Sequence, residues 1–419
     1  MIRFLTILLT GSMILGISMC SAQDTQSISH PSIPRNTDPD VAETELLELA
    51  SGNSAFAFNL YKTIIINDDG NVFFSPYSIS AALAMTYAGA EGITEIEMAE
   101  VLQFPLYENR IHSSFNTLDQ NLTAAAERDS TFSLHIVNAL WGQTGYSFLP
   151  EFLEILAANY GAGISFLDFS DNPELCRETI NEWVTEQTHG KIEDLIPRHV
   201  LNIATRLVLT NAIYFKAQWL FQFDEMGTVD QPFHLINGEQ VIVPTMHQTE
   251  HFPMAKGDGY IAVELPYTSR RMSMLVIVPD ENRFQEVEDN LKNDFIDEII
   301  RSLSETNLYL SMPKFETVSA FQLQDVLSEM GMPSAFGMSA DFSGMDGSFS
   351  LYIASVIHKA FVSVDEEGTE AAAATAVVMQ KVNGESSIEF IVDRPFIYLI
   401  RDRETGTLLF IGRVLNPIE

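Results

Sequence analysis

The stretch Asp365–Val382 most constrains how this chain can fold, because it fits two different local structures. Residues 370–379 contain neither proline nor glycine and are rich in alanine, the strongest helix former, which favours a helix. With a period of two, one face of the segment carries no charge; it consists of Thr369, Ala371, Ala373, Thr375, Val377 and Met379. Such a face suits a strand whose small side chains can enter a packed sheet. Gly368 precedes it and predicts a hinge, because glycine reaches backbone angles that other residues avoid.

Several short motifs stand in a fixed order along the chain. The hinge motif is Glu366-Glu367-Gly368-Thr369-Glu370, followed by Ala371, Ala372, Ala373 and Ala374. Upstream and downstream of it stand Val72–Ile79, Asn181–Val184 with Gly190–Ile192, Ala340–Met345, Tyr352–Ala360 and Asp393–Phe396. From about Ser54 to the C-terminus, this combination resembles the serpins, protease inhibitors that trap their target by inserting a cleaved loop into a sheet.

The resemblance implies an α+β serpin fold. Its parts would be a large mixed central sheet with surrounding helices, further smaller sheets and an exposed reactive-centre loop over about residues 366–394. It also implies that Ser75, Ser78, Asn211 and His358 form a buried polar cluster where the central strands part to admit the loop. Trp219 would pack near the hinge, and Lys314 would pair with Glu366 at the base of the loop. The alternative is that each polar side chain of the cluster is hydrogen-bonded to nearby backbone rather than to the others. Trp219 would then be an ordinary core residue and Lys314 a solvated surface charge.

The scissile bond is placed by counting along the family motif from the first hinge glutamate. The count falls on Val382–Asn383, and a small β-branched residue suits elastase-like or subtilisin-like proteases. A shift of one residue would place Lys381 at the cleaved bond and favour a trypsin-like target. The resemblance therefore implies a suicide inhibitor that forms a covalent complex with an extracellular serine protease. Non-inhibitory serpins acting as carriers, chaperones or storage proteins are the alternative.

Residue periodicity predicts several elements independently of the resemblance. Proline at position 76 and Gly89 bracket a buried helix, and Tyr260–Leu265 with Met272–Val278 form a hairpin. Further strands are expected at residues 133–141, 206–215, 308–312, 396–401 and 408–414, and helices at 176–188 and 321–330. Asn53 or Ser54 is expected to cap a first helix, and Thr94–Glu97 to form the capping box of another.

The N-terminus predicts export. A basic start, an apolar run over Phe4–Ile17 and small residues before Gln23 indicate a signal peptide over residues 1–22. Cleavage before Cys20 would instead give a lipid-anchored or periplasmic protein. Residues 23–45 are expected to form a flexible tether, and residues 46–419 a single domain, because no interior repeat or linker is evident. After that cleavage Cys176 is the only cysteine, so disulfides cannot stabilise the domain.

Charge and motifs limit the partners and the chemistry. The net charge of −34 disfavours nucleic acid and anionic surfaces as partners. No second long apolar stretch suggests a membrane span, and we expect a monomer without a cofactor. The chain lacks a G-x-S-x-G elbow, an H-E-x-x-H motif and a phosphate-binding loop, so an enzyme is not expected. His247 and His251 have helical spacing, but nearby prolines and β-formers favour a strand, so no metal site is predicted.

Overall fold

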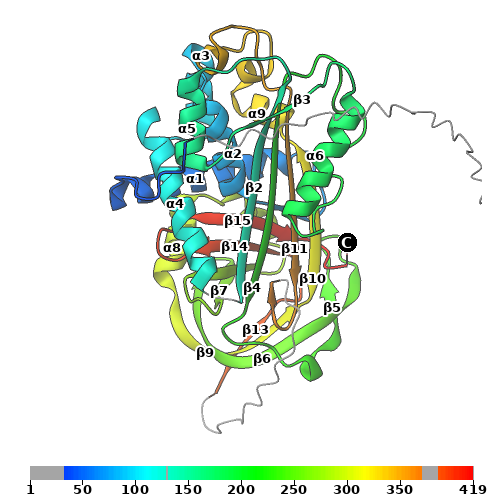
Figure 1. The fold of residues 1–419 in the computed structure, drawn as a ribbon. Helices are drawn as coiled ribbons and strands as arrows, with labels where there is room; N and C mark the ends of the chain where they lie inside the picture. The colour runs from blue at the N-terminus through cyan, green and yellow to red at the C-terminus, as the bar shows by residue number, and fades with distance from the viewer. Residues whose placement is uncertain (1–32, 129–130, 370–385, 419) are drawn as a thin grey trace, which may run out of the picture.

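The computed structural model describes residues 33–128, 131–369 and 386–418 (Figure 1). Its helices are α1 (Glu43–Ile64), α2 (Pro76–Tyr87), α3 (Gly92–Val101), α4 (Glu108–Arg128), α5 (Pro150–Tyr160), α6 (Pro173–Gln187), α7 (Phe284–Asp289), α8 (Asn293–Ser302), α9 (Gln324–Met330) and α10 (Ser343–Asp346), with 3₁₀ helices η1 (Glu225–Gly227) and η2 (Pro333–Phe336). Its strands are β1 (Val72–Phe74), β2 (Phe132–Gln143), β3 (Ile164–Leu167), β4 (Leu207–Gln218), β5 (Val229–His234), β6 (Gln240–Gly257), β7 (Tyr260–Pro266), β8 (Met272–Pro279), β9 (Ser304–Pro313), β10 (Phe315–Gln322), β11 (Ser355–Val364), β12 (Gly368–Thr369), β13 (Ile388–Ile391), β14 (Phe396–Asp402) and β15 (Leu408–Val414). The α+β class expected from the sequence is confirmed.

One sheet holds the start of the predicted hinge. Its six strands follow the order β10-β11-β12-β4-β2-β3. The sheet is mixed, because β11 runs parallel to β4 and β2 parallel to β3, whereas β10–β11 and β2–β4 are antiparallel. Its long strands run side by side down the front of the molecule (Figure 1). The first nine residues of β4 are all buried, as expected for a central strand covered on both faces.

The second sheet has nine strands in the order β1-β15-β14-β8-β7-β6-β9-β13, with β5 paired to β6. Strands expected in several smaller sheets are thus joined by hydrogen bonds into one. Strands β14 and β15 run crosswise behind the long strands of the first sheet (Figure 1). Phe215 on β4 contacts Phe410 on β15, with ring centroids 5.5 Å apart. The two sheets therefore face each other across an apolar and aromatic core.

Helix α2 lies inside this core. All twelve of its residues are buried, and it contacts β2, β4 and β15. The Ser75 hydroxyl accepts from the backbone N–H of Ser78, and Pro76 occupies the first helical position, where its missing N–H costs nothing. A helix that is mostly apolar and carries no charged residue suits such surroundings. The buried helix predicted between Pro76 and Gly89 is confirmed.

Helix α6 covers the other face of the six-stranded sheet. Ile180 and Val184 on the helix belong to one buried cluster with Trp141 and Val208 on β2 and β4. In Figure 1 the helix lies in front of the sheet, beside β11. Cys176, Ile180 and Val184, whose helical spacing predicts this helix, lie on the face that it buries.

Three expectations about element boundaries are wrong. Helix α1 begins at Glu43, well before Asn53, because Leu46, Leu49 and Ala50 already bury one helical face. The first turn is held by the Glu45 carboxylate, which accepts from the Ala42 N–H at 2.8 Å. Thr94 lies inside α3 rather than capping it, and its hydroxyl accepts from the Asp341 N–H. Residues 321–322 belong to β10, so α9 starts only at Gln324.

The described end of the expected tether is attached to the domain. Arg35 donates to the Asn116 side chain on α4 at 2.7 Å and forms an ion pair with Asp119 at 2.7 Å. The backbone N–H of Asn36 donates to the carbonyl of Ala158 on α5 at 2.8 Å. At Arg35 and Asn36 the described part of this segment is therefore attached to α4 and α5.

The helices of the described ranges include none that is both long enough and apolar enough to traverse a lipid bilayer.

Candidate functional site

The four polar residues assigned to the middle of the sheet lie together in the structure. Asn211 on β4 and His358 on β11 are opposite each other in the parallel register, and neither side chain is exposed. His358 Nδ1 hydrogen-bonds to Asn211 Oδ1, and its Nε2 accepts from the backbone N–H of Ser75 at 3.1 Å. The Asn211 amide donates to the backbone carbonyl of Ser78 at 2.9 Å. The cluster thus links the two central strands to the start of α2.

The sequence analysis missed a fifth member, Asn138 on β2. It lies directly opposite Asn211, and its side-chain oxygen accepts from the Asn211 amide. Asn138, like Asn211, is a polar residue among the apolar residues of a predicted strand. A polar residue at such a position is the sequence signal that could have identified Asn138. The polar cluster therefore crosses three neighbouring strands, β2, β4 and β11.

Burial controls the charge of this cluster. It lowers the pKa of His358 to about 3, because a charged imidazole cannot be hydrated there. The neutral ring uses Nε2 as an acceptor for Ser75 and Nδ1–H as a donor to Asn211. A second proton on His358 would remove the acceptor and add a buried charge. The neutral form is therefore the one that fits the closed sheet.

The start of the predicted insertion segment already lies in the sheet. Strands β4 and β11 pair directly over Val208–Ile213 and Ser355–Ala360. Beyond those pairs, β12 lies between them, with Thr369 opposite Ala217 on β4 and Val364 on β11. A turn reverses the chain into β12, because the Asp365 N–H donates to the Gly368 carbonyl at 2.9 Å. The Asp365 carboxylate accepts from the backbone N–H groups of Glu367 and Gly368.

Gly368 is required here for a reason other than the one expected. Its backbone does not lie in the left-handed region. Instead, a Cβ at this position would stand 2.1 Å from the carbonyl oxygen of Ala217 and 2.7 Å from the Cα of Gln218. Close approach of β12 to β4 therefore demands glycine, and the hinge depends on space rather than on unusual backbone angles.

Trp219 lies at the base of the hinge, as the resemblance implied. Its Nε1–H donates to the Asp365 carbonyl at 3.0 Å, and its backbone N–H donates to the Glu367 carbonyl at 2.9 Å. The indole stacks on Tyr267, with centroids 4.7 Å apart. The sequence analysis missed Tyr267, whose hydroxyl bonds to the Thr369 hydroxyl at 2.7 Å. Both hydroxyls are buried, so this bond satisfies the first polar side chain of the uncharged face that begins at Thr369.

Glu366 and Lys314 form the expected ion pair, at 2.6 Å. Thr228, which the sequence analysis did not identify, donates to the other carboxylate oxygen, also at 2.6 Å. Burial by itself would raise the pKa of the Glu366 carboxyl, but the hydrogen bonds from Lys314 and Thr228 outweigh it and hold the pKa below its usual value. The carboxylate is therefore held ionised at the point where the chain leaves β11.

The remaining predicted site residues lie outside the described residues. They are the hinge residues Glu370, Ala371, Ala372, Ala373 and Ala374, and the residues around the proposed scissile bond, Lys381, Val382 and Asn383. The described chain resumes at residue 386, and β13 then pairs with β9. The two anchored ends of the predicted loop are thus β12 in the first sheet and β13 in the second.

The histidines and the cysteine bear on possible metal binding and nucleophilic chemistry. His247 and His251 lie on strand β6, as the flanking residues predicted. Among residues 33–418 outside the two interior gaps, no three His, Cys, Asp or Glu side chains are grouped as metal ligands would be. Burial raises the pKa of the Cys176 thiol to about 11, so it is a poor nucleophile.

Comparison with known proteins identifies the family. A family model described as serpin (serine protease inhibitor) matches residues 51–417. The chain is 42% identical over 427 residues to an uncharacterized serpin-like protein of Thermococcus kodakarensis, with 98% of this chain and 99% of that protein covered. It is 38% identical over 384 residues to the leukocyte elastase inhibitor of Bos taurus, covering 88% of this chain and 100% of the relative. The structure of human thyroxine-binding globulin superposes with a TM-score of 0.81 at 33% identity, covering 90% of this chain and 100% of that one. The chain therefore belongs to the serpin family.

Proposed function

We propose that this protein is a secreted suicide inhibitor of serine proteases. The protease would attack the loop between β12 and β13, and after cleavage the segment following Thr369 would continue β12 into the six-stranded sheet. The observation that carries the proposal is β12 itself, whose two residues already occupy the space between β4 and β11.

The register of β4 and β11 shows which strand contacts would have to separate during insertion. Six direct pairs between β4 and β11 lie ahead of β12, and each must separate for the new strand to pass. Each lost strand contact would be replaced by two, one on either side of the inserted strand, so the sheet gains backbone hydrogen bonds. Roughly fourteen inserted residues at about 3.3 Å each span ~46 Å, enough to carry a bound protease across the domain.

The polar cluster lies on the line along which the strands would separate. Asn211 and His358 are one of the six opposing pairs, and they meet through side-chain hydrogen bonds. Such bonds can be exchanged for bonds to the incoming strand without leaving a buried polar group unpaired. We infer that the cluster closes the sheet before cleavage and permits it to open afterwards.

The target class follows from the proposed scissile bond. Val382–Asn383 favours an elastase-like or subtilisin-like protease, and the likeness to proteins named leukocyte elastase inhibitor supports this choice. Lys381 would instead favour a trypsin-like protease. We propose the elastase-like class.

Covalent trapping is the direct test. The protein is mixed with an elastase-like and, separately, a trypsin-like protease, and the products are separated on denaturing gels. The expected result is a band that contains both proteins, together with a released C-terminal fragment whose N-terminal residue identifies the cut bond. Complete cleavage of the loop without such a band would contradict the inhibitor proposal.

A non-inhibitory carrier is the second candidate, because thyroxine-binding globulin has a similar fold. The hinge argues against it. On the uncharged face Thr369 is followed by Ala371 and Ala373, with Glu370 on the opposite face, whereas bulky or charged residues on the entering face would hinder entry into the sheet. In the gel experiment a carrier would give only the cleaved chain.

Secretion belongs to the same proposal and has its own test. The predicted leader, residues 1–22, would be absent from the mature protein, whose first residue would be Gln23. Intact-mass measurement of the native protein should give this start. A mass that includes the leader contradicts secretion, and a lipid-modified Cys20 would show surface anchoring.

A further inference from the structure

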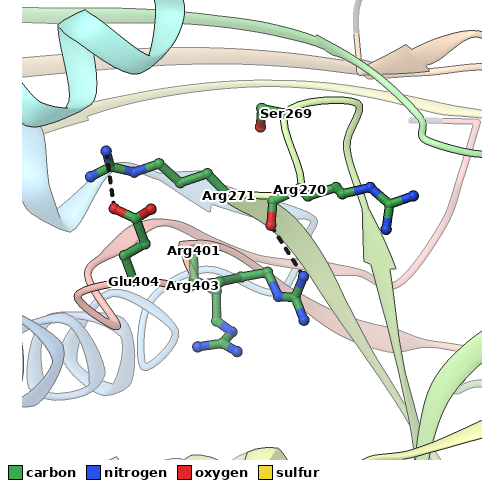
Figure 2. Close-up of a pocket in the computed structure, with 6 residues that line it drawn as sticks. All are labelled: Ser269, Arg270, Arg271, Arg401, Arg403 and Glu404. Carbon is green, nitrogen blue, oxygen red and sulfur yellow. Dashed lines mark hydrogen bonds and ion pairs between the residues drawn. The ribbon is translucent and has the colours of Figure 1, made fainter.

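Four arginines gather around one surface pocket, although two of them lie about 130 residues from the other two. Arg270 and Arg271 belong to the turn between β7 and β8, and Arg401 and Arg403 lie at the end of β14. Ser269 and Glu404 complete the lining of this pocket of about 390 Å³ (Figure 2). The chain has only 23 Lys and Arg against 57 Asp and Glu, so such a gathering of positive charge is unexpected. We call this site the arginine pocket.

Arg401 and Arg403 share one buried carboxylate. Arg401 Nη2 lies 2.9 Å and Arg403 Nε 3.4 Å from the side chain of Glu264, which is only 2% exposed. The Ser273 hydroxyl also donates to this carboxylate, at 2.8 Å. Two guanidinium groups on one carboxylate leave one positive charge in excess. Leaving the buried Glu264 carboxylate without a partner would strongly destabilise the fold, by the general rule for buried charges. Glu264 therefore also fixes the position of Arg401.

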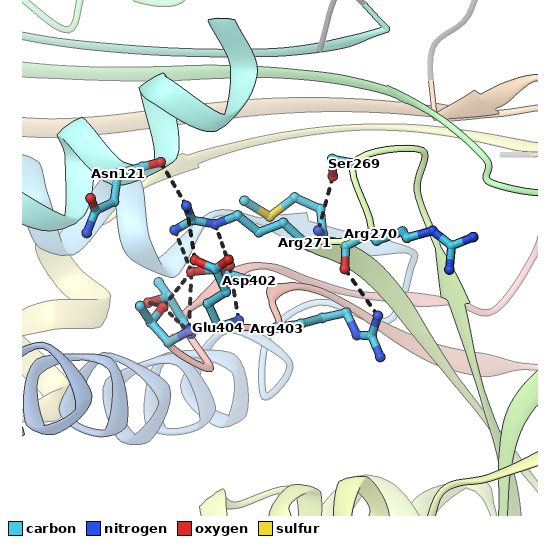
Figure 3. Close-up of polar contacts among 10 residues, drawn as sticks. Asn121, Ser269, Arg270, Arg271, Asp402, Arg403 and Glu404 are labelled. Carbon is cyan, nitrogen blue, oxygen red and sulfur yellow. Dashed lines mark hydrogen bonds and ion pairs between the residues drawn. The ribbon is translucent and has the colours of Figure 1, made fainter. Parts of the chain in front are cut away.

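Arg271 is held on the other side of the pocket. Its Nε and Nη2 donate to the two oxygens of Asp402 at 2.9 and 3.0 Å, and its Nη1 donates to the Asn121 carbonyl at 3.1 Å (Figure 3). Glu404, whose side chain is 67% exposed, reaches the same guanidinium at 3.2 Å. Asp402 is therefore the buried partner of Arg271, and Glu404 is an exposed carboxylate beside the excess charge.

Arg270 adds a second unusual feature. Its φ is +56°, in the left-handed region that costs most residues about 1 kcal/mol and favours glycine or asparagine. Its carbonyl accepts from Arg403 Nη1 at 3.1 Å, and its side chain extends from the turn away from Arg271 (Figure 2).

We propose that the arginine pocket binds a small polar molecule that carries a phosphate or sulfate ester. Guanidinium groups match tetrahedral oxyanions through paired N–H donors, and the buried carboxylates of Glu264 and Asp402 contact three of the four arginines. The volume suits an organic ligand rather than a bare ion. All six lining residues are polar or charged, so the organic part is polar, such as a sugar, rather than an apolar carrier ligand.

Calorimetric titration of the full chain at fixed ionic strength tests the proposal. The probes are glucose 6-phosphate and glucose 6-sulfate, with glucose as the neutral control. Arg403→Gln removes an exposed guanidinium while leaving Glu264 paired with Arg401, and should weaken binding about tenfold or more. Glu404→Gln removes the competing carboxylate and should strengthen binding several-fold. Arg283→Gln removes an arginine paired with Asp258 and Glu286, outside the pocket, and should leave the affinity unchanged.

A further variant separates folding from binding. Arg270→Gly relieves the positive φ, so it should unfold at a temperature no lower than the wild type and yet bind the probes more weakly. Saturable binding of either ester, with Arg403→Gln weaker and Glu404→Gln tighter, supports the proposal. Absence of binding by both esters, or equal affinity in wild type and Arg403→Gln, overturns it.

Discussion

At the scale of single residues, the buried polar side chains depend on one another. The His358 ring accepts a hydrogen bond from the Ser75 N–H and is hydrogen-bonded to the Asn211 side chain. The Asn211 amide in turn donates to the Asn138 side chain and the Ser78 carbonyl. Each of these groups would be costly to leave unpaired in the core. A change in the protonation of one member therefore acts on the strands that carry the others.

The first prediction concerns the pH dependence of stability. An imidazole in the unfolded chain titrates near 6.5, whereas burial lowers the pKa of His358 to about 3. Between these values the unfolded chain binds a proton that the folded chain does not, so His358 makes stability fall as the pH drops from about 6.5 towards 3. His358→Gln lacks this dependence. The difference in unfolding free energy between the two proteins should narrow by up to about 1.4 kcal/mol per pH unit across this window.

Denaturant unfolding at pH values between 4 and 7.5 measures that difference. His234→Gln, at an exposed histidine, is the control and should follow the wild type. Parallel curves for wild type and His358→Gln would show that His358 is not buried in its neutral form.

The second prediction concerns Thr369, which rests on the proposed function. Its side chain is already buried between β4 and β11 and bonded to Tyr267, so Thr369→Arg would have to bury a charge for β12 to stay in the sheet and for insertion to continue from it. Insertion should slow, and the protease should complete hydrolysis before it is trapped. The number of inhibitor molecules consumed per trapped protease should rise severalfold. Thr369→Ser keeps the hydroxyl and should trap as well as the wild type; equal trapping by Thr369→Arg would contradict the assigned face.

At the scale of elements, β12 has only two residues, but its place in the sheet holds the preceding turn against the end of β4. The backbone N–H groups of Trp219 and Phe223 donate to the carbonyls of Glu367 and Glu366. These bonds exist only while the Asp365–Gly368 turn is seated against the end of β4. The amides of Trp219 and Phe223 therefore report on the hinge.

The third prediction uses those amides. Gly368→Ala places a methyl group against the Ala217 carbonyl, so β12 should leave the sheet. Hydrogen exchange should then accelerate in peptides that contain Trp219 and Phe223. Gly227→Ala is a matched control, because a Cβ there meets no atom closer than 3.9 Å. Unchanged exchange in Gly368→Ala would mean that the strand tolerates the methyl group and that the steric argument is wrong.

Local patterns predicted the elements that are local in origin. The β7–β8 and β14–β15 hairpins, the buried helix α2 and the strand β2 follow from residue periodicity and turn residues. The pairing of Asn138 with Asn211, the contact of Tyr267 with Thr369 and the arginine pocket depend on which strands become neighbours. Residue spacing does not contain that information. The resemblance supplied Asn211, His358, Lys314 and Trp219 together with some of their partners, Ser75, Ser78 and Glu366. It did not supply Asn138, Thr228 or Tyr267.

At the scale of the whole molecule, the proposed mechanism requires that a more stable arrangement of the fold exists, with one more strand in the six-stranded sheet. The direct pairs between β4 and β11 close the sheet, and β12 marks the place where another strand would enter. Under the proposed mechanism, the connection to β13 in the second sheet keeps the uncut chain from entering further. Cutting the loop would remove this constraint, and the gain in hydrogen bonds and buried surface would then drive insertion.

The thermal stability of the protein before and after cleavage of its loop tests this claim most directly. The loop is cut near Val382 with a protease that is not trapped, the cleaved protein is repurified, and both forms are heated under the same conditions. We predict that the cleaved form unfolds at a clearly higher temperature and that cleaved Thr369→Arg shows little of this increase. A cleaved wild-type protein that unfolds at the same or a lower temperature would contradict insertion, and with it the proposed mechanism of inhibition.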